Sequence, residues 1–148
     1  MLLTEPSLDE LDNIERHNID LTVYNDFFID GLEESGKEFS THIKIDTGMH
    51  RVGCEPEDFK NLYNKIKKSK TINLAGICTH FPLADEEIEP TQESIELFKE
   101  TIKEINLDDL LIHADNSGSS FYNFDPTFNL SRVGLTVYGC NITPAEVN

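Results

Sequence analysis

The stretch Thr41-His42-Ile43-Lys44-Ile45-Asp46-Thr47-Gly48-Met49-His50-Arg51 decides the fold of this chain. Polar and apolar residues alternate from Thr41 to Asp46, which is typical of a short β-strand. The strand runs directly into a polar loop with a glycine, and two cations, Lys44 and Arg51, lie seven residues apart. A β/α enzyme presents charge in this way at the carboxyl edge of its sheet. We therefore expect functional side chains at this edge.

Strand and helix patterns alternate along the rest of the chain. Strands are expected at residues 19–24, 41–46, 72–79, 110–114 and 135–138. Helices are expected from Ser7, after Asn25, from Glu55 onward and from Pro90 or Thr91. Short connections in this order imply parallel strands with right-handed crossovers, so the fold class is α/β with about five strands. Five strands suit an open doubly wound sheet or part of a TIM-type (β/α)8 barrel.

Composition limits the classes of partner. The 148 residues carry 28 acidic and 12 basic side chains, a formal net charge of −16. Phosphate binding needs clustered Lys and Arg, so neither nucleic acid nor a membrane surface is an expected partner. There is no apolar run of about 18 residues and no signal-peptide pattern at the amino terminus, which favours a cytoplasmic location. Cys54, Cys78 and Cys140 are too widely separated for a zinc site or a disulfide framework, so no metal is expected.

Three further groups of polar residues lie beside predicted strands. Each has an ordinary structural interpretation: His80 bonded to a backbone carbonyl, Asn116 or Ser117 as a helix cap, and Arg132 as a surface arginine. Their shared position near strand ends favours a site, because small hydroxyl and amide residues there offer donors to an anion.

Four segments in this order resemble the alanine racemases, pyridoxal-phosphate enzymes that interconvert L- and D-alanine. The segments Lys44–Arg51, Thr79–Phe81, His113–Ser117 and Ser131–Gly139 are similar to the family patterns K-x-D-T-G-M-x-R, T-H-F, H-x-A-N-S and R-P-G-x-x-L-Y-G. The resemblance runs from about Ile19 to Gly139. It implies that residues 1–148 are one partial N-terminal barrel domain. Asp115 stands where a small apolar residue is usual, and Val133 replaces a proline.

The resemblance assigns the cofactor pyridoxal 5′-phosphate to residues at three strand ends. His80 would pack on the cofactor ring. Ser117 and the backbone of Gly134 and Leu135 would hold the phosphate, because glycine lets the main chain approach closely. Asn116 would orient neighbouring groups.

The resemblance also assigns roles to three cations. Arg132 would face the pyridine nitrogen, and because arginine keeps its proton, that nitrogen stays unprotonated. Lys44 matches a lysine that is often carbamylated, and Arg51 matches the arginine that it positions. Carbamylation turns a repulsive Lys–Arg pair into an attractive one. Arg51 would then reach the phenolic oxygen of the cofactor and the carboxylate of a small amino-acid substrate.

Racemisation further needs a Schiff-base lysine and an opposing base. In the family these come from the first barrel strand and from a tyrosine in a carboxyl-terminal domain of the other subunit. Neither is expected within this chain. We therefore expect a racemase fragment, of a family that supplies D-alanine for the cell wall, inactive alone. Strand edges at Ile19–Tyr24 and Leu135–Tyr138 would pair with the missing barrel half or with a second copy in a homo-oligomer.

Two alternatives remain open from the sequence. The chain is a non-catalytic module that binds the cofactor or complements another chain, or it is a fragment of a racemase for another amino acid such as serine.

Overall fold

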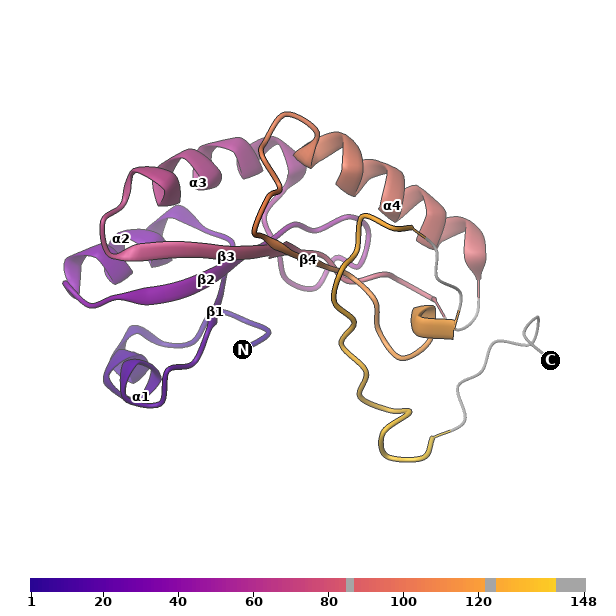
Figure 1. Cartoon of the computed structure of the whole chain (residues 1–148), viewed down its shortest axis with the longest axis horizontal. Helices are drawn as coiled ribbons and strands as arrows, with labels where there is room; N and C mark the ends of the chain where they lie inside the picture. The colour runs from indigo at the N-terminus through magenta and orange to yellow at the C-terminus, as the bar shows by residue number, and fades with distance from the viewer. Residues whose placement is uncertain (85–86, 122–124, 141–148) are drawn as a thin grey trace.

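Figure 1 shows the computed structural model of the chain, which describes residues 1–84, 87–121 and 125–140. Four parallel strands form one sheet in the order β1-β2-β3-β4, and helices alternate with them along the chain. The strands are β1 Leu21–Val23, β2 Phe39–Lys44, β3 Ile72–Cys78 and β4 Leu111–His113. The helices are η1 Leu8–Glu10, α1 Leu11–Arg16, α2 Asp26–Glu34, α3 Pro56–Lys68, α4 Ile88–Ile102 and η2 Ser119–Phe121. The predicted α/β class with parallel β/α units is confirmed.

The predicted strand at 135–138 is wrong, so the described residues contain four strands rather than about five. The amides of Val137, Tyr138 and Gly139 each donate to a carbonyl three residues earlier, which forms consecutive turns. Leu135 and Val137 are exposed, so their apolar character is not buried against the sheet. These local hydrogen bonds replace the ladder that a fifth strand would need, and the second edge of the sheet is β4.

One face of the sheet, the helix-covered face, is apolar. Successive strand residues point to opposite faces. Ile43, Ile77 and Ile112 are at most 2% exposed and belong to the main hydrophobic core. The helices contribute to the same core the side chains of Phe59, Leu62, Ile66, Phe98 and Ile102. Figure 1 shows α3 and α4 along this side of the sheet.

The opposite side, the inner face, is polar. The strand register places Lys44 beside Cys78 and Cys78 beside His113, which forms one row at the carboxyl edge. A register shift after Thr41 brings His42 opposite Gly76 in the row below. In Figure 1 the amino-terminal segment and the yellow segment that ends at residue 140 lie on this side instead of helices α3 and α4.

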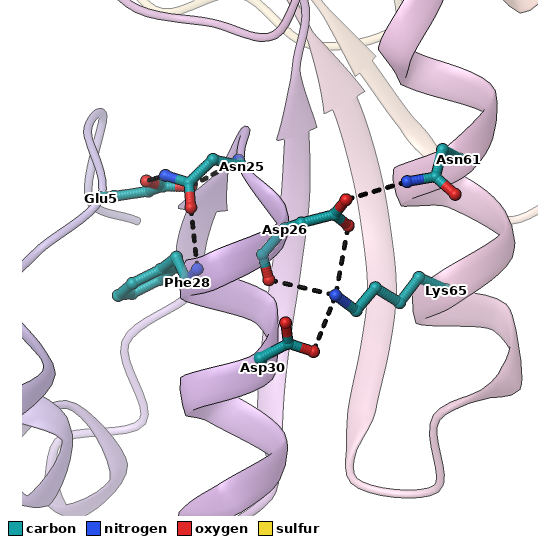
Figure 2. A network of polar contacts seen from close by, with 7 residues as sticks. All are labelled: Glu5, Asn25, Asp26, Phe28, Asp30, Asn61 and Lys65. Carbon is teal, nitrogen blue, oxygen red and sulfur yellow. Dashed lines mark hydrogen bonds and ion pairs between the residues drawn. The ribbon is translucent and has the colours of Figure 1, made fainter.

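Two polar contacts fix how α2 begins and how it meets α3 (Figure 2). Asn25 Oδ1 accepts from the amide of Phe28 at 2.8 Å, so Asn25 caps the helix that the sequence predicts after it. Lys65 Nζ of α3 lies 2.7 Å from Asp30 Oδ1 and 3.2 Å from Asp26 Oδ1 of α2. Helix α3 has acids in its first turn and lysines in its last turn, the order that the helix dipole favours. Helix α4 begins at Ile88 rather than at Pro90 or Thr91.

Within the part of the chain that is described, none of the helices has the length and apolar character needed to cross a bilayer.

Candidate functional site

The loop after β2 is folded back by its own backbone. The Asp46 carboxylate accepts from the amides of Gly48 and His50 at 3.0 Å each. The Asp46 amide in turn donates to the Cys54 carbonyl at 2.9 Å. Gly53 has a φ of +142°, and a Cβ there would lie 2.6 Å from the Asp46 nitrogen. Only glycine permits this close return, which leaves Arg51 above the carboxyl edge of the sheet.

Lys44 and Arg51 line one small cavity of about 160 Å³, the Lys44 cavity. Lys44 is 7% exposed, and among the described residues its Nζ has no ion-pair partner. Burial lowers the pKa of Lys44, and the Arg132 and Arg51 guanidinium groups lower it further, while Cys78 opposes them. The site therefore raises the share of the neutral amine at this position relative to an exposed lysine.

A second cavity of about 250 Å³, the Ser117 cavity, is lined by His80, Asn116, Ser117, Gly118, Arg132, Gly134 and Leu135. These include all six residues that the sequence predicted to bind a cofactor. His80 and Arg132 line both cavities, so the two cavities adjoin. The fold thus brings the eight predicted site residues together at one edge of the sheet.

The turn after β4 presents small polar groups to the Ser117 cavity. Asn116 Oδ1 accepts from the amides of Gly118 and Ser119 at 3.0 and 3.1 Å, so its interpretation as a cap of one turn is confirmed. Asn116 Nδ2 donates to the Phe81 carbonyl at 3.3 Å, which ties this turn to the end of β3. Ser117 is 5% exposed, and its Oγ accepts from the Gly134 amide at 2.9 Å.

Arg132 is the centre of the site, and its interpretation as a surface arginine is wrong. Its Nη2 donates to the carbonyls of Thr79 at 2.8 Å and Ala114 at 3.2 Å, and its Nη1 donates to His113 Nδ1. Burial lowers the pKa of Arg132, although Cys78 and Asp115 raise it, and the group stays a cation at neutral pH. The guanidinium therefore joins the ends of β3 and β4.

His80 is neutral at this site. Its Nδ1 lies 3.4 Å from Arg132 Nη2, so this nitrogen faces a donor rather than a carbonyl. Burial, and then the cations Arg132, Arg51 and Lys44, lower the pKa of His80 to about 4. A neutral imidazole beside a cavity can pack on an aromatic ring without the cost of a buried charge.

Asp115 does not line the Ser117 cavity, although the sequence placed an acid close to it. Its carboxylate accepts from Ser131 Oγ at 3.2 Å, and its carbonyl accepts from the Arg132 amide at 2.9 Å. The carboxylate that departs from the family pattern therefore ties Ser131 to the turn after β4.

Sequence reasoning missed three residues behind Arg132, namely Asp20, His42 and Gly76. His113 Nε2 lies 2.9 Å from His42 Nδ1, and His42 Nε2 lies 3.7 Å from Asp20 Oδ2. The available signal was spacing: His42 is two residues before Lys44 and so shares its face of the strand.

Other candidate sites are weaker. A cavity of about 690 Å³ runs along α4 between side chains of both charges and contains none of the predicted residues. Among residues 1–84, 87–121 and 125–140, no three His, Cys, Asp or Glu side chains are grouped so that they could hold a metal ion.

Known proteins resemble this chain in sequence. The family model described as "Alanine racemase, N-terminal domain" matches residues 1–142. An alanine racemase of Treponema denticola is 35% identical over 97% of this chain and 41% of its own length, and one of Streptococcus uberis is 30% identical over 89% and 37%. The chain thus spans about two fifths of the length of these curated relatives.

Two solved structures share the fold. The alanine racemase of Bacillus anthracis with bound L-Ala-P is 26% identical, with a TM-score of 0.84 over 99% of this chain and 40% of that one. The alanine racemase of Oenococcus oeni has a TM-score of 0.89 over 99% of this chain and 45% of that one, and at 23% identity it indicates the fold alone.

Proposed function

This chain belongs to the alanine racemase family, and we propose that it binds pyridoxal 5′-phosphate as part of the N-terminal barrel domain of such a racemase. The observation that carries the proposal is the convergence of the six predicted cofactor residues on the Ser117 cavity, beside the cavity of Lys44 and Arg51.

The Ser117 cavity suits the phosphate. Ser117 Oγ and the Gly134 amide already lie 2.9 Å apart, and both can donate to a phosphate oxygen in place of each other. Gly118 and Leu135 line the same cavity, and the Arg132 cation lies at its side. Hydrogen bonds to an anion in such surroundings are stronger than those between neutral groups.

Arg132 and His80 suit the ring. When bound, pyridoxal phosphate supplies an electron-withdrawing ring that makes the α-proton of an amino acid removable. Arg132 can offer only donors, so a ring nitrogen that faces it remains an unprotonated acceptor. The neutral His80 ring can pack on the cofactor ring, because His80 and Arg132 both line the junction of the two cavities.

Lys44 and Arg51 suit the substrate side. The lowered pKa of Lys44 raises the share of the neutral amine, the form that adds carbon dioxide to give a carbamate and releases a proton to water. The carbamate would offset the charge of Arg51, which would be left to bind the amino-acid carboxylate. An NMR spectrum in ¹³C-bicarbonate tests this step. We expect a carbamate signal from the unmodified chain and none from a Lys44→Arg variant. Identical spectra of the two would contradict the step.

We further propose that this chain alone binds the cofactor without racemising alanine. Racemisation needs a covalent lysine and a second base. Among the described residues that line the two cavities, Lys44 is the only lysine, and none is a tyrosine. Further segments would supply these groups and extend the sheet beyond its outer strands β1 and β4, in a homo-oligomer with a small amino-acid substrate.

An absorbance titration with pyridoxal phosphate tests the proposed function. We expect saturable binding that leaves no lysine adduct after borohydride reduction. Ser117→Ala should weaken binding about 10- to 100-fold, since a hydrogen bond to an anion contributes about 1.5–3 kcal/mol. The control is Lys103→Ala, which removes a cation from the unrelated cavity along α4. Equal affinities of Ser117→Ala and the unmodified chain, or a reduced adduct on any lysine, would contradict the proposal.

A further inference from the structure

Arg132, His113, His42 and Asp20 form a row of charged or polar side chains that crosses the inner face, with both histidines buried and the Asp20 side chain partly exposed. We propose that Asp20 and His42 are positioning residues that act through His113 to fix the donors of Arg132. The functional consequence rests on the proposed role of Arg132 in cofactor binding, whereas the row itself does not.

The row has continuous contacts. Arg132 Nη1 donates to His113 Nδ1, His113 Nε2 lies 2.9 Å from His42 Nδ1, and His42 Nε2 lies 3.7 Å from Asp20 Oδ2. The two rings meet edge to face, with centroids 5.0 Å apart and an interplanar angle of 66°. His42 and His113 are 2% and 1% exposed, so water does not compete for these contacts.

The proton positions in this row are dictated from its Arg132 end. Arginine has donors only, so His113 Nδ1 must accept, and a neutral His113 must carry its proton on Nε2. That proton points at His42 Nδ1, which must accept in turn. His42 therefore carries its proton on Nε2, which faces the Asp20 carboxylate. Each ring has one allowed tautomer, and the anion at the far end stabilises the same arrangement.

Burial in the first place, and nearby cations in the second, lower the pKa of both rings. Burial, then Arg132, His42 and Lys44, lower the pKa of His113 to about 3. Burial lowers the pKa of His42 as well, and there Asp20 opposes the effect while the amino terminus and Arg132 add to it. A second proton on either ring would set two N–H groups against each other and break the row.

Gly76 makes the row possible. It lies on β3, between the strands that carry His42 and His113, and the register places it opposite both His42 and Leu111. A Cβ at Gly76 would lie 2.4 Å from His42 Nδ1 and 2.4 Å from the Leu111 carbonyl oxygen. Real Cβ atoms do not approach so closely, so any side chain there would displace the His42 ring. The absence of a side chain at Gly76 thus lets His42 of β2 and His113 of β4 share a hydrogen bond across β3.

The row gives Arg132 one orientation. With Nη1 held by His113 and Nη2 held by the Thr79 and Ala114 carbonyls, the guanidinium cannot rotate away from the two cavities. If the tautomers reversed, His113 Nδ1 would present a proton to Arg132 and push the guanidinium out of place.

The test is the histidine tautomer state, read from long-range ¹H–¹⁵N NMR spectra of the whole chain at pH 7.5. We expect the Nε2–H tautomer on both His42 and His113. His42→Phe should give mixed tautomers at His113, and His42→Gln should keep the Nε2–H form because its amide oxygen can still accept. An Nδ1–H form on either ring of the unmodified chain, or an unchanged His113 signal in His42→Phe, would overturn the proposal.

Asp20→Asn supplies a milder variant that spares the buried rings, since the Asp20 side chain is 39% exposed. Its amide oxygen is a weaker acceptor for the His42 Nε2 proton than a carboxylate, and its NH₂ group can instead donate to Nε2, so the preference for the Nε2–H tautomer should weaken; we expect pyridoxal phosphate affinity to fall about fivefold, the equivalent of one hydrogen bond. The control Glu15→Gln, an exposed acid that pairs with Lys37, should change neither readout. Identical tautomers in Asp20→Asn and Glu15→Gln would remove Asp20 from the proposal.

The two proposals fail separately. Correct tautomers without cofactor binding would leave the row intact and refute the proposed function. Cofactor binding with the wrong tautomers would refute only the positioning roles of Asp20 and His42.

Discussion

The two faces of the sheet differ in what completes them. The helix-covered face is closed by the chain itself: Ile43, Ile77 and Ile112 are almost fully buried under α3 and α4. The inner face carries histidines, a lysine and a thiol, and it borders a cavity of about 510 Å³ that reaches Met1 and Leu111, both partly exposed. The comparison teaches that stability is concentrated on one face and chemistry on the other, within the same strands.

Neighbours on β3 offer the most direct way to break this comparison. Ile77 faces the helices at 0% exposure and Cys78 faces inward at 3%. We expect Ile77→Ala to lower the free energy of unfolding by about 2–5 kcal/mol through lost burial and a cavity. Cys78→Ala removes one sulfur atom and should cost well under half as much. Urea unfolding followed by circular dichroism measures both, and equal losses would refute the division of roles between the faces.

Gly76→Ala targets the inner face alone. The new methyl group meets the His42 ring and the Leu111 carbonyl, and such overpacking costs about 1–3 kcal/mol. Pyridoxal phosphate binding should weaken more than stability suggests, because Arg132 loses its support. The matched control is Gly36→Ala: Gly36 has a positive φ but open space around it, so only backbone strain is added. Comparable loss of binding in both variants would count against the inner face as the cause.

Lowering the pH should lower the free energy of unfolding, because histidines of the inner face resist protonation in the folded chain. The pKa values of His113 and His80 are lowered to about 3 and about 4, and that of His42 is lowered too. The unfolded chain takes up these protons near pH 6.5 while the folded chain does not. The stabilisation is therefore complete above pH 6.5 and is lost as the pH falls, by up to about 1.4 kcal/mol per pH unit for each ring.

Free energies of unfolding measured between pH 7.5 and 4.5 give the slope of stability against pH. His113→Gln should reduce this slope by the contribution of one histidine ring. A slope that is the same with and without His113 would show that the buried row does not remain neutral.

The smallest effect belongs to the surface contact between α2 and α3 in Figure 2. Lys65 lies within 3.2 Å of Asp26 and Asp30 and is partly exposed. Lys65→Met should lower thermal stability by less than about 1 kcal/mol, and added salt should remove the difference, because exposed ion pairs are weak and screened. A larger loss that persists in salt would mean that the aliphatic part of Lys65 packs between the helices.

The sequence predicted the strands 19–24, 41–46, 72–79 and 110–114 to within about two residues, because alternation and apolar runs are local properties. It failed at 135–138, where an equally apolar segment forms local turns. Whether such a segment becomes a strand depends on a neighbour whose amides and carbonyls are free, and periodicity carries no information about neighbours. The start of α4 shifted by two or three residues for a smaller reason, since helix ends are set by caps and fraying.

The site was predictable as a set of residues and not as an arrangement. Ser117, Gly134 and Arg132 could be picked out from their positions beside strands. The sequence did not indicate that Asp115 turns to Ser131 rather than toward the Ser117 cavity, nor that the Thr79 and Ala114 carbonyls hold the Arg132 guanidinium.

By itself the sequence determined which residues alternate, which loops carry cations and small polar groups, and that the strands run parallel, because each of these depends on residues a few positions apart. Only the tertiary structure decided that Arg132 meets Thr79 and His113, and that His42 reaches His113 across Gly76. These partners lie 19 to 71 residues apart, and their contact depends on strand register and on one missing side chain. Register and close approach are set by the packed fold as a whole, and so they fix the chemistry of residues that the sequence could only name.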